Sequence, residues 1–416
     1  MKKSLIALAA LAAVSAASAQ SSVTLYGVVD IGYGSHTTKS RDGSVSIKSS
    51  GIMDGANAGN RIGFRGTEDL GGGLKANFVV EQGISPTTGQ LFGVRAGGTG
   101  HQVDGFGLTN GFTGLSGAGG SYSTSTNRQS YVGLSSDKMG TVNVGWQYNI
   151  YYEISTLAGY NIGSEGVPGA DKAHILGINA GLGGARSNGI SYISPAFAGG
   201  FTVRAQYGAN TGRETVEANG VAVGNGLTTD KNRRMALMLQ YANGPLSVAG
   251  AYTTIRSTQV NGVALAAAGQ TTNVLGFLNA APTGTPLTGV GRTANVYQLG
   301  SSYDFGVAKL AATYLNGKNG GTATSLASTK FRAYQLGVSA PFGAIVPFIT
   351  FGRGKSTNET TNLLSEDYKS AQIGVRYSLS KRTTAYAFYG RTTNEAAAAT
   401  ALYRDSKAIV GVAHSF

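Results

Sequence analysis

Hydrophobic and polar residues alternate along most of the chain after residue 20. In the segment 369–379, for example, Ile373 and Val375 share one parity. Gln372 and Arg376 share the other parity. The segments 141–148 and 201–208 repeat this pattern. Side chains of a β-strand point alternately to its two faces, so the pattern predicts strands with one apolar and one polar face.

Sixteen such runs are separated by connectors of two alternating sizes. We expect the strand centres near residues 28, 64, 78, 131, 145, 190, 204, 237, 250, 298, 311, 335, 348, 373, 388 and 411. The short connectors hold Gly, Pro, Asn and Asp, which tight turns need. The long connectors are 34–59, 84–126, 149–185, 209–232, 255–292, 316–329, 355–366 and 393–404. Short turns at one rim and long loops at the other predict an all-β fold, a 16-stranded antiparallel transmembrane β-barrel.

The apolar faces of these runs carry tyrosine near their ends. These residues are Tyr148, Tyr207, Tyr241, Tyr252, Tyr303, Tyr314 and Tyr377. Amphipathic rings favour the headgroup level of a bilayer, so they predict aromatic girdles on a lipid-facing wall. The polar faces carry Arg, Gln, Asn and Gly, which would line a wet lumen. The run near 345–352 contains Pro347 and alternates poorly, so the pattern leaves its facing open.

The first 19 residues have the features of a secretory signal peptide. Lys2 and Lys3 precede an apolar run at 5–14, which is too short to span a bilayer. The residues Ala-Ser-Ala at 17–19 form a small-residue cleavage site. We therefore expect 1–19 to be removed and 20–416 to form one barrel domain.

Composition narrows the classes of function. Glycine supplies 64 of 416 residues, charged residues only 13%, and cysteine is absent, which excludes disulfide scaffolds, thiol catalysis and Cys-ligated zinc. The histidines, His36, His101, His174 and His414, lack the spacing of metal ligands. Because no motif singles out a nucleophile or a nucleotide site, we expect no metal, no cofactor and no catalytic residue. The net charge is +13, or +11 without Lys2 and Lys3, but the arginines are dispersed through strands, which argues against nucleic-acid binding.

The chain ends on Phe416, which shares its parity with Val410 and Val412. A terminal aromatic residue on an alternating strand resembles the signal that the barrel-assembly machinery of the outer membrane recognises. We therefore expect Phe416 to act as the membrane-insertion signal and this machinery to be a partner.

Several segments resemble the Gram-negative trimeric general porins of the beta-proteobacterial type. They are the first strand at 22–30 (SVTLYGVVD), the hairpin at 61–76 (RIGFRGTEDLGGGLKA), the turns at 303–309 and 379–383, and the ending at 411–416 (GVAHSF). The resemblance covers the whole mature chain. It implies a homotrimer in contact with outer-membrane lipid and lipopolysaccharide. It also implies that the third long connector, 149–185, folds into the lumen and narrows the pore.

The resemblance further implies a charged constriction, in which wall arginines face acidic residues of the inward loop. The basic wall would consist of Arg61, Arg65, Arg128 and Arg186. The opposing carboxylates would be Glu153, Glu165 and Asp171. Because basic side chains raise the local anion concentration, such a constriction would favour anions.

The function that we expect is a water-filled channel in the outer membrane of a Gram-negative bacterium. Small anionic and neutral hydrophilic solutes would pass by passive diffusion. Three alternatives stay open: a channel specific for one solute, a barrel that serves mainly as surface structure or adhesin, and a barrel enzyme. The connector 84–126 is mostly Gly, Ser and Thr, and we expect it at the outer surface.

Overall fold

The computed structural model describes most of the chain after residue 21. The described ranges are 22–91, 128–155, 162–164, 166–169, 186–214, 217–218, 221–222, 228–260, 290–321, 328–359, 361–395 and 402–416. The expected signal peptide at 1–19, the larger part of the connector 84–126, Glu165 and Asp171 lie outside them.

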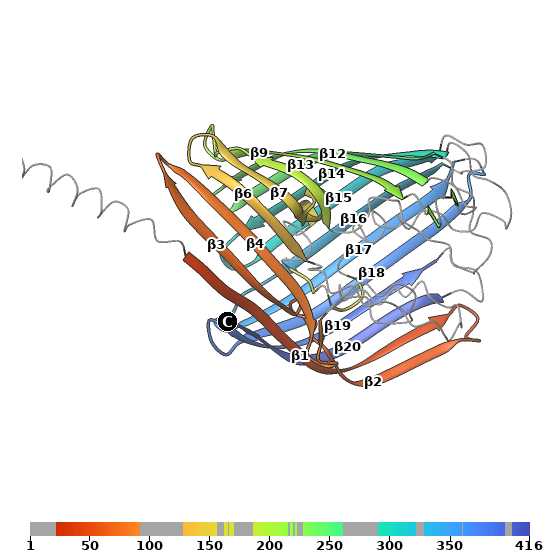
Figure 1. Ribbon diagram of the computed structural model, residues 1–416. Coiled ribbons are helices and arrows are strands. Elements are labelled where there is room, and N and C mark those ends of the chain that lie inside the picture. The colour runs from red at the N-terminus through yellow and green to blue at the C-terminus, as the bar shows by residue number, and fades with distance from the viewer. Residues whose placement is uncertain are drawn as a thin grey trace, which may run out of the picture.

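Sixteen strands within these ranges form a closed antiparallel barrel (Figure 1). They are β1 (Ser22–Ser40), β3 (Arg61–Gly71), β4 (Leu74–Ser85), β6 (Gln129–Ser136), β7 (Gly140–Tyr148), β8 (Arg186–Ile193), β9 (Phe201–Glu214), β12 (Thr228–Asn243), β13 (Leu246–Val260), β14 (Val290–Asp304), β15 (Lys309–Gly321), β16 (Thr329–Ser339), β17 (Ile345–Asn358), β18 (Leu364–Ser378), β19 (Thr383–Asn394) and β20 (Leu402–Ser415). Each expected strand centre falls inside one of these strands, which confirms the predicted fold.

Five shorter elements complete the described ranges. They are β2 (Ser46–Asp54), β5 (Gln90–Leu91), β10 (Glu217–Ala218), β11 (Val221–Ala222) and α2 (Ile150–Ser155). No helix in the described part of the chain is long and apolar enough to cross a bilayer.

The first and last strands close the barrel. Ile31 of β1 lies opposite Val412 of β20 in the register of this pair. Beyond the end of β20, the Phe416 N–H donates to the Gly27 carbonyl at 3.2 Å, and the Gly27 N–H donates to the Phe416 carbonyl at 3.1 Å. A side chain at position 27 would collide with the Phe416 ring, so this close approach needs glycine. Closure pairs the backbone groups of both sheet edges, as a wall in contact with hydrocarbon requires.

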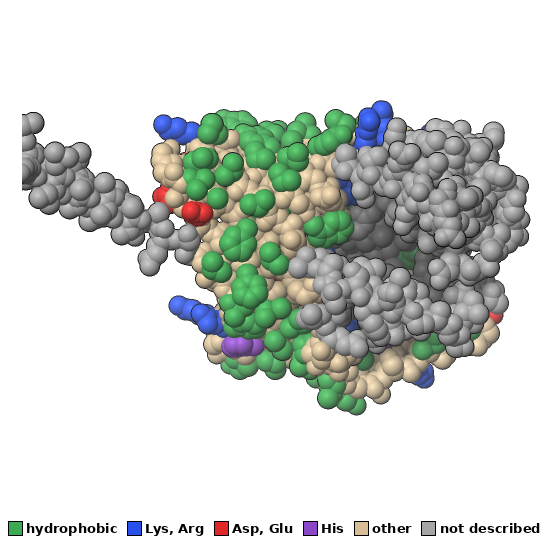
Figure 2. All heavy atoms as spheres, in the orientation of Figure 1, with side chains coloured by type: hydrophobic (Ala, Val, Ile, Leu, Met, Phe, Trp, Pro, Cys, Tyr) green, Lys and Arg blue, Asp and Glu red, His purple; other side chains and the backbone are tan. Residues whose placement is uncertain are grey.

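Alternation along the strands places the apolar face outward. On β12, Leu237 is 57% exposed whereas the adjacent Met238 is 1% exposed. The facing of the run near 345–352 is settled on β17, where Phe348 is buried while Ile349 and Phe351 are exposed on the outer wall. The expected girdle residues Tyr207, Tyr252, Tyr303, Tyr314 and Tyr377 are also exposed. Figure 2 shows the resulting apolar outer surface.

Two sides of the barrel differ in strand length. We call β3, β4, β6, β7 and β8 the short wall and β12–β20 the long wall. The short-wall strands have 8–12 residues. The long-wall strands have 11–16 residues. Figure 1 shows the long wall reaching further toward the end of the barrel at which the tip of the β1–β2 hairpin lies. A membrane-spanning strand needs only about 9–11 residues, so the long wall continues beyond the apolar band.

The connector 34–59 contains strands, so the prediction of a continuous loop was wrong. β1 continues to Ser40 and pairs with β2 over residues 31–39. The other edge of β1 stays paired with β20 as far as Ser40. This hairpin carries Ser, Thr and Lys on both faces, so it lacks the apolar alternation that reveals strands in a sequence.

Candidate functional site

Two arginines of β3 have the inward parity. Arg61 and Arg65 alternate with Phe64, which is 47% exposed on the outer wall. The Arg65 guanidinium lies over the Tyr26 ring of β1, with Cζ 5.2 Å from the ring centroid. Arg61 donates to the Gly59 carbonyl at 3.1 Å, which fixes its side chain near the start of β3. The lumen therefore has two guanidinium groups on one strand.

Glu81 of β4 connects Arg61 to a third arginine. Its Oε1 accepts a hydrogen bond from Arg128 Nε at 2.5 Å, and its Oε2 lies 3.6 Å from Arg61 Nε. The Tyr26 hydroxyl donates to the same Oε2 at 3.1 Å. Glu81 and Arg128 are only 5% and 9% exposed, so bulk water screens this pair weakly. A single carboxylate offsets part of the positive charge of two arginines.

The fourth arginine joins this group through Tyr148. Arg128 and Arg186 both donate to the Tyr148 hydroxyl, at 2.9 and 2.7 Å. The Tyr148 ring stacks on Tyr152 of α2 at a centroid distance of 4.6 Å, and the Arg186 guanidinium lies 4.4 Å from its centroid. The prediction of Tyr148 as a girdle residue was therefore wrong. Tyr148 is the last residue of β7. Its side-chain position is set by contacts with α2 and the arginines, and not by the alternation along the strand.

The helix α2 follows β7 and lies against β9, β12, β13 and β14. Asn149 caps its N-terminus, because its Oδ1 accepts from the Tyr152 N–H at 2.9 Å. Ile150 and Ile154 are buried in one cluster with Met238 of β12. These apolar contacts fix the helix on the inner face of the barrel (Figure 1).

Glu153 of α2 pairs with a wall arginine that the sequence analysis did not name. Its Oε2 lies 2.7 Å from Nη1 of Arg204 on β9. Burial raises the pKa of the Glu153 carboxyl, and Arg204 opposes this shift. The pair lines a cavity of about 180 Å³ together with Tyr131, Gln147 and Gln206. A polar cavity of this size has room for several water molecules beside the helix.

The described residues between 162 and 169 continue along the inner face of the long wall. Gln372 of β18 accepts from the Ser164 N–H at 2.9 Å and donates to the carbonyls of Ser164 and Val167 at 2.9 and 2.7 Å. Arg376 of the same strand donates to two further carbonyls of this segment. We call Gln372 and Arg376 the loop anchors. Their side chains occupy backbone acceptors that would otherwise be buried without a partner.

The return from β2 to β3 meets the same segment. Asp30 of β1 is fully buried and accepts from the Asn57 N–H at 2.8 Å and from the Tyr386 hydroxyl at 2.6 Å. The Ser164 hydroxyl donates to the Ala56 carbonyl. Hydrogen bonds thus tie both connectors to the inner wall.

The structure brings together the four arginines that the sequence analysis selected. Arg61, Arg65, Arg128 and Arg186 are connected through Tyr26, Glu81 and Tyr148. Glu153 contacts Arg204 instead, and Glu165 and Asp171 lie outside the described residues. The sequence pattern did not indicate the roles of Glu81, Arg204 and Arg376. Strand alternation had placed Arg204 and Arg376 on polar faces, but nothing in the sequence indicated their partners.

Comparisons with known proteins identify the family. The profile of the Gram-negative porin family matches residues 7–397. The chain belongs to the Gram-negative porin family. An outer membrane porin protein of Bordetella pertussis is 28% identical over 340 residues, which cover 77% of this chain and 70% of that protein. Outer membrane porin protein 32 of Delftia acidovorans is 30% identical over 319 residues, which cover 75% of this chain and 68% of that protein.

Solved porin structures have the same fold. An anion-selective porin from Comamonas acidovorans aligns with a TM-score of 0.61 at 24% identity, covering 95% of this chain and 100% of that chain. The trimer form of OmpT, an outer membrane protein of Vibrio cholerae, aligns with a TM-score of 0.58 at 14% identity, covering 95% of this chain and 99% of that chain. This porin is therefore a β-barrel of the Gram-negative outer membrane, and its relatives are channel proteins rather than enzymes. In the described part of this porin, no cluster of His, Asp and Glu is arranged to hold a metal ion.

Proposed function

We propose that this porin is a passive channel for small hydrophilic solutes and that it prefers anions. The observation that carries the proposal is a cluster of four arginines with one carboxylate, Glu81, which contacts Arg61 and Arg128 directly. Four positive charges and one negative charge give this cluster a net charge of +3. The similarity to a porin described as anion-selective supports the same preference.

The position of this charge determines its effect on passing ions. Low-dielectric walls focus the field of the arginines into the lumen, which raises the local concentration of anions. One unit charge about 4 Å from an ion contributes roughly 1 kcal/mol in a water-like medium. The combined interaction of several such arginines with a passing anion therefore exceeds the thermal energy of about 0.6 kcal/mol, and the single Glu81 offsets only part of their field.

We further propose that the connector 149–185 narrows the lumen. Its helix α2 lies against β9, β12, β13 and β14, and its described residues between 162 and 169 are held on β18 by the loop anchors. The described parts of the connector thus lie on the inner face of the barrel, whereas the arginine cluster lies on the short wall, with Tyr26 of β1 beside it. Solutes would pass between the two. Glu153, with Glu165 and Asp171, would supply the acidic side of this passage.

A homotrimer surrounded by outer-membrane lipid and lipopolysaccharide is the assembly that we propose. The short-wall strands β6, β7 and β8 have only 8 or 9 residues, which suits contact with neighbouring subunits better than contact with lipid headgroups. Large apolar residues are exposed nearby, including Leu25, Phe64 and Phe416 at 51%, 47% and 42%. The trimer form of OmpT supports this assembly.

The two chain ends would serve export and insertion. We propose that residues 1–19 are removed, so mass spectrometry of the outer-membrane form should find Gln20 as the first residue. Retention of 1–19 would contradict this assignment. Phe416 would be read by the barrel-assembly machinery, and its backbone bonds to Gly27 support a role in the closing seam.

The decisive test is single-channel recording of the purified mature protein in a planar bilayer. We expect stable conductance steps, and in a KCl gradient we expect a reversal potential with the sign of chloride preference. The preference should grow at low salt, because the screening length increases from about 10 Å at 0.1 M to about 30 Å at 0.01 M. A potassium preference would contradict the anion proposal, and the absence of conductance steps would contradict the channel.

A further inference from the structure

The cavity beside α2 is lined mostly by neutral groups that form hydrogen bonds. It has a volume of about 180 Å³ and lies between α2, the short-wall strands β6, β7 and β8, and the next strand β9. Its lining includes four carboxamide side chains, those of Gln129, Asn143, Gln147 and Gln206. Each carboxamide carries both donors and acceptors, so the cavity offers hydrogen bonds of both kinds.

The alternation along the strands directs the lining toward the lumen. Val132 of β6 is 59% exposed on the outer wall, so the adjacent Tyr131 has the inward parity. Asn143 of β7, Ser191 of β8 and Gln206 of β9 stand side by side in the strand register. The polar side chains therefore form one row on the inner face of the barrel, next to α2.

The two charged residues of the lining cancel each other. Arg204 Nη1 and Glu153 Oε2 are 2.7 Å apart, so the cavity carries one positive and one negative charge. An anion in the cavity would meet the Glu153 carboxylate, and a cation would meet the Arg204 guanidinium. Because like charges in contact are unfavourable, the cavity favours a neutral solute, in contrast to the arginine cluster with its net charge of +3.

The lining also keeps hydrogen-bonding capacity of both kinds. Arg204 Nε is a donor and Asn143 Oδ1 is an acceptor, and both are buried without a hydrogen-bond partner in the described ranges of the chain. Gln206 Nε2 donates to the Tyr148 carbonyl at 3.1 Å, which fixes this amide while its nitrogen has a second hydrogen. A solute in the cavity would lie next to all three side chains.

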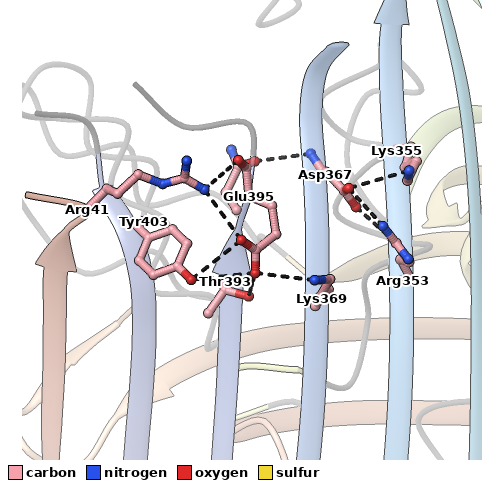
Figure 3. A network of polar contacts seen from close by, with 9 residues as sticks. Arg41, Arg353, Lys355, Asp367, Lys369, Thr393, Glu395 and Tyr403 are labelled. Carbon is pink, nitrogen blue, oxygen red and sulfur yellow. Dashed lines mark hydrogen bonds and ion pairs between the residues drawn. The ribbon is translucent and has the colours of Figure 1, made fainter. Parts of the chain in front are cut away.

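The charged residues near the tip of the β1–β2 hairpin, which we call the loop end of the barrel, are paired among themselves. Figure 3 shows this network. Asp367 lies 2.9 Å from Arg353 and 3.4 Å from Lys355, and Glu395 lies 3.5 Å from Lys369. These carboxylates have their partners within the protein, so the network at the loop end does not indicate a ligand, whereas the cavity beside α2 does.

We propose that this cavity is a binding subsite for a neutral polyhydroxylated solute, a monosaccharide or a short polyol, on its way through the pore. The proposal rests on the proposed function as a channel for small hydrophilic solutes. A hydroxyl group donates one hydrogen bond and accepts up to two, so a row of hydroxyls matches a lining that contains both donors and acceptors. A carboxylate only accepts and an ammonium group only donates, so neither matches this lining as well.

The size of the cavity limits the solute. A volume of about 180 Å³ equals that of several water molecules. A single sugar ring fills such a space, whereas a disaccharide is too large for it. The Tyr131 ring adds an apolar face on which the C–H groups of a sugar can pack. Because a permeating solute must also leave, we expect weak binding that appears as saturation of the flux.

The test measures uptake of D-glucose, as the probe, into liposomes that contain the purified mature protein. Uptake is recorded over a range of sugar concentrations and repeated with triethylene glycol. This control solute is neutral and of similar size, but most of its oxygen atoms are ethers, which accept hydrogen bonds and cannot donate them.

The variant Asn143→Leu removes one carboxamide from the cavity. Asn77→Leu is the matched control, because Asn77 and Asn143 lie on either side of Gly133 in the strand register. The Oδ1 atoms of both asparagines are without a partner in the described residues, but Asn77 does not line the cavity. Gln129→Leu changes a second carboxamide of the lining, and heat-dependent migration on gels shows which variants are folded.

We expect uptake of D-glucose by the wild type to saturate and uptake of triethylene glycol to rise in proportion to its concentration. Asn143→Leu should raise the half-saturating glucose concentration about fivefold, because one hydrogen bond to the sugar is lost. Gln129→Leu should shift it in the same direction, and Asn77→Leu should stay within about twofold of the wild type.

Three results would overturn the subsite. They are glucose uptake by the wild type that stays proportional to concentration, saturation by triethylene glycol at the same concentration as glucose, and an equal shift in Asn77→Leu and Asn143→Leu. Conductance in KCl separates these results from a failure of the channel. Wild-type protein that conducts but does not saturate with glucose refutes only the subsite, and protein that neither conducts nor takes up either solute refutes the channel.

Discussion

The short wall and the long wall use their arginines on opposite faces of the same sheet. On the short wall, Arg61 and Arg65 have the inward parity and belong to the cluster around Glu81. On the long wall, Arg233 and Arg256 have the outward parity and lie beyond the apolar band. Arg376, one of the inward arginines of the long wall, donates to carbonyl groups of the inward connector.

The difference shows that strand length and charge placement are coupled. A strand of 8 or 9 residues ends where the apolar band ends, so its cations can act only in the lumen or at the turns. A strand of 14–16 residues has several positions beyond the band, where an outward cation is exposed to headgroups. Net charge alone therefore says little about ion selectivity, because the two sets of cations face different surroundings.

The largest effect is expected from a charge on the outer face of the short wall. Phe64 lies opposite Leu25, and both are exposed on the proposed subunit contact. The variant Phe64→Arg should abolish the trimer band on unheated gels, because loss of a central interface contact costs about 2 kcal/mol or more. The matched variant Leu237→Arg, on the long wall, should keep the trimer. If both variants remain trimeric, the short wall is not the contact.

The second effect concerns the lumen. The double variant Arg61→Ser, Arg128→Ser removes two positive charges beside Glu81. We expect the permeability ratio of chloride to potassium to fall about fivefold or more, because each lost charge contributes roughly 1 kcal/mol to the interaction with a passing ion. Reversal potentials in a KCl gradient measure this ratio. Glu81→Gln should move it the other way, and Lys138→Ser with Arg382→Ser is the control of equal charge. An unchanged reversal potential in the double arginine variant would remove these residues from the constriction.

The third effect concerns the connector on the inner face of the long wall. Gln372→Ala removes the hydrogen bonds to Ser164 and Val167, each worth about 0.5–1.5 kcal/mol. The segment should loosen, and single-channel conductance should rise by some tens of per cent with more current noise. Gln335→Ala is the matched control, since Gln335 is buried on β16 and its amide nitrogen has no partner in the described residues. Identical traces for the two variants would show that this segment does not limit the current.

The smallest effect is expected at the loop end of the long wall. The ammonium groups of Lys318 and Lys330 lower the pKa of the Glu359 carboxyl from 4.5 to about 2. A lowered carboxyl pKa stabilises the folded state fully above pH 4.5, and this stabilisation is lost as the pH falls toward 2. Glu359→Gln should therefore lower the melting temperature slightly at pH 7, with no difference left near pH 2. The effect is small because both lysine partners are exposed to solvent, which screens the interaction. A difference that persists at pH 2 would point to another cause.

Much of the fold could be predicted because its signal is local. Alternation with a period of two identifies a barrel strand from its own residues, so the strand centres and the shared parity of Arg61 and Arg65 followed from the sequence. The signal fails where both faces are polar, as in the hairpin of β1 and β2. It also fails at strand ends, where Tyr148 takes its position from Tyr152.

The partners of the charged residues could not be predicted, because they depend on the register between strands. Glu81 meets Arg128 across the β4–β6 pair, 47 residues along the chain. Glu153 meets Arg204 only because α2 packs on the inner faces of β9 and β12. The family resemblance indicated the four wall arginines. The sequence could not show that their carboxylate partner, Glu81, belongs to the barrel wall itself.

The seam between Gly27 and Phe416 makes the order of synthesis matter. The edge of β1 near Gly27 finds its second neighbour only when Phe416, 389 residues further along the chain, has been made. Until then β1 has a free edge, which is a template for pairing with other chains. Completion of the chain is thus a condition for hiding this edge. A prematurely terminated chain cannot close the barrel, so the edge of β1 stays unpaired and can be recognised by chaperones and proteases.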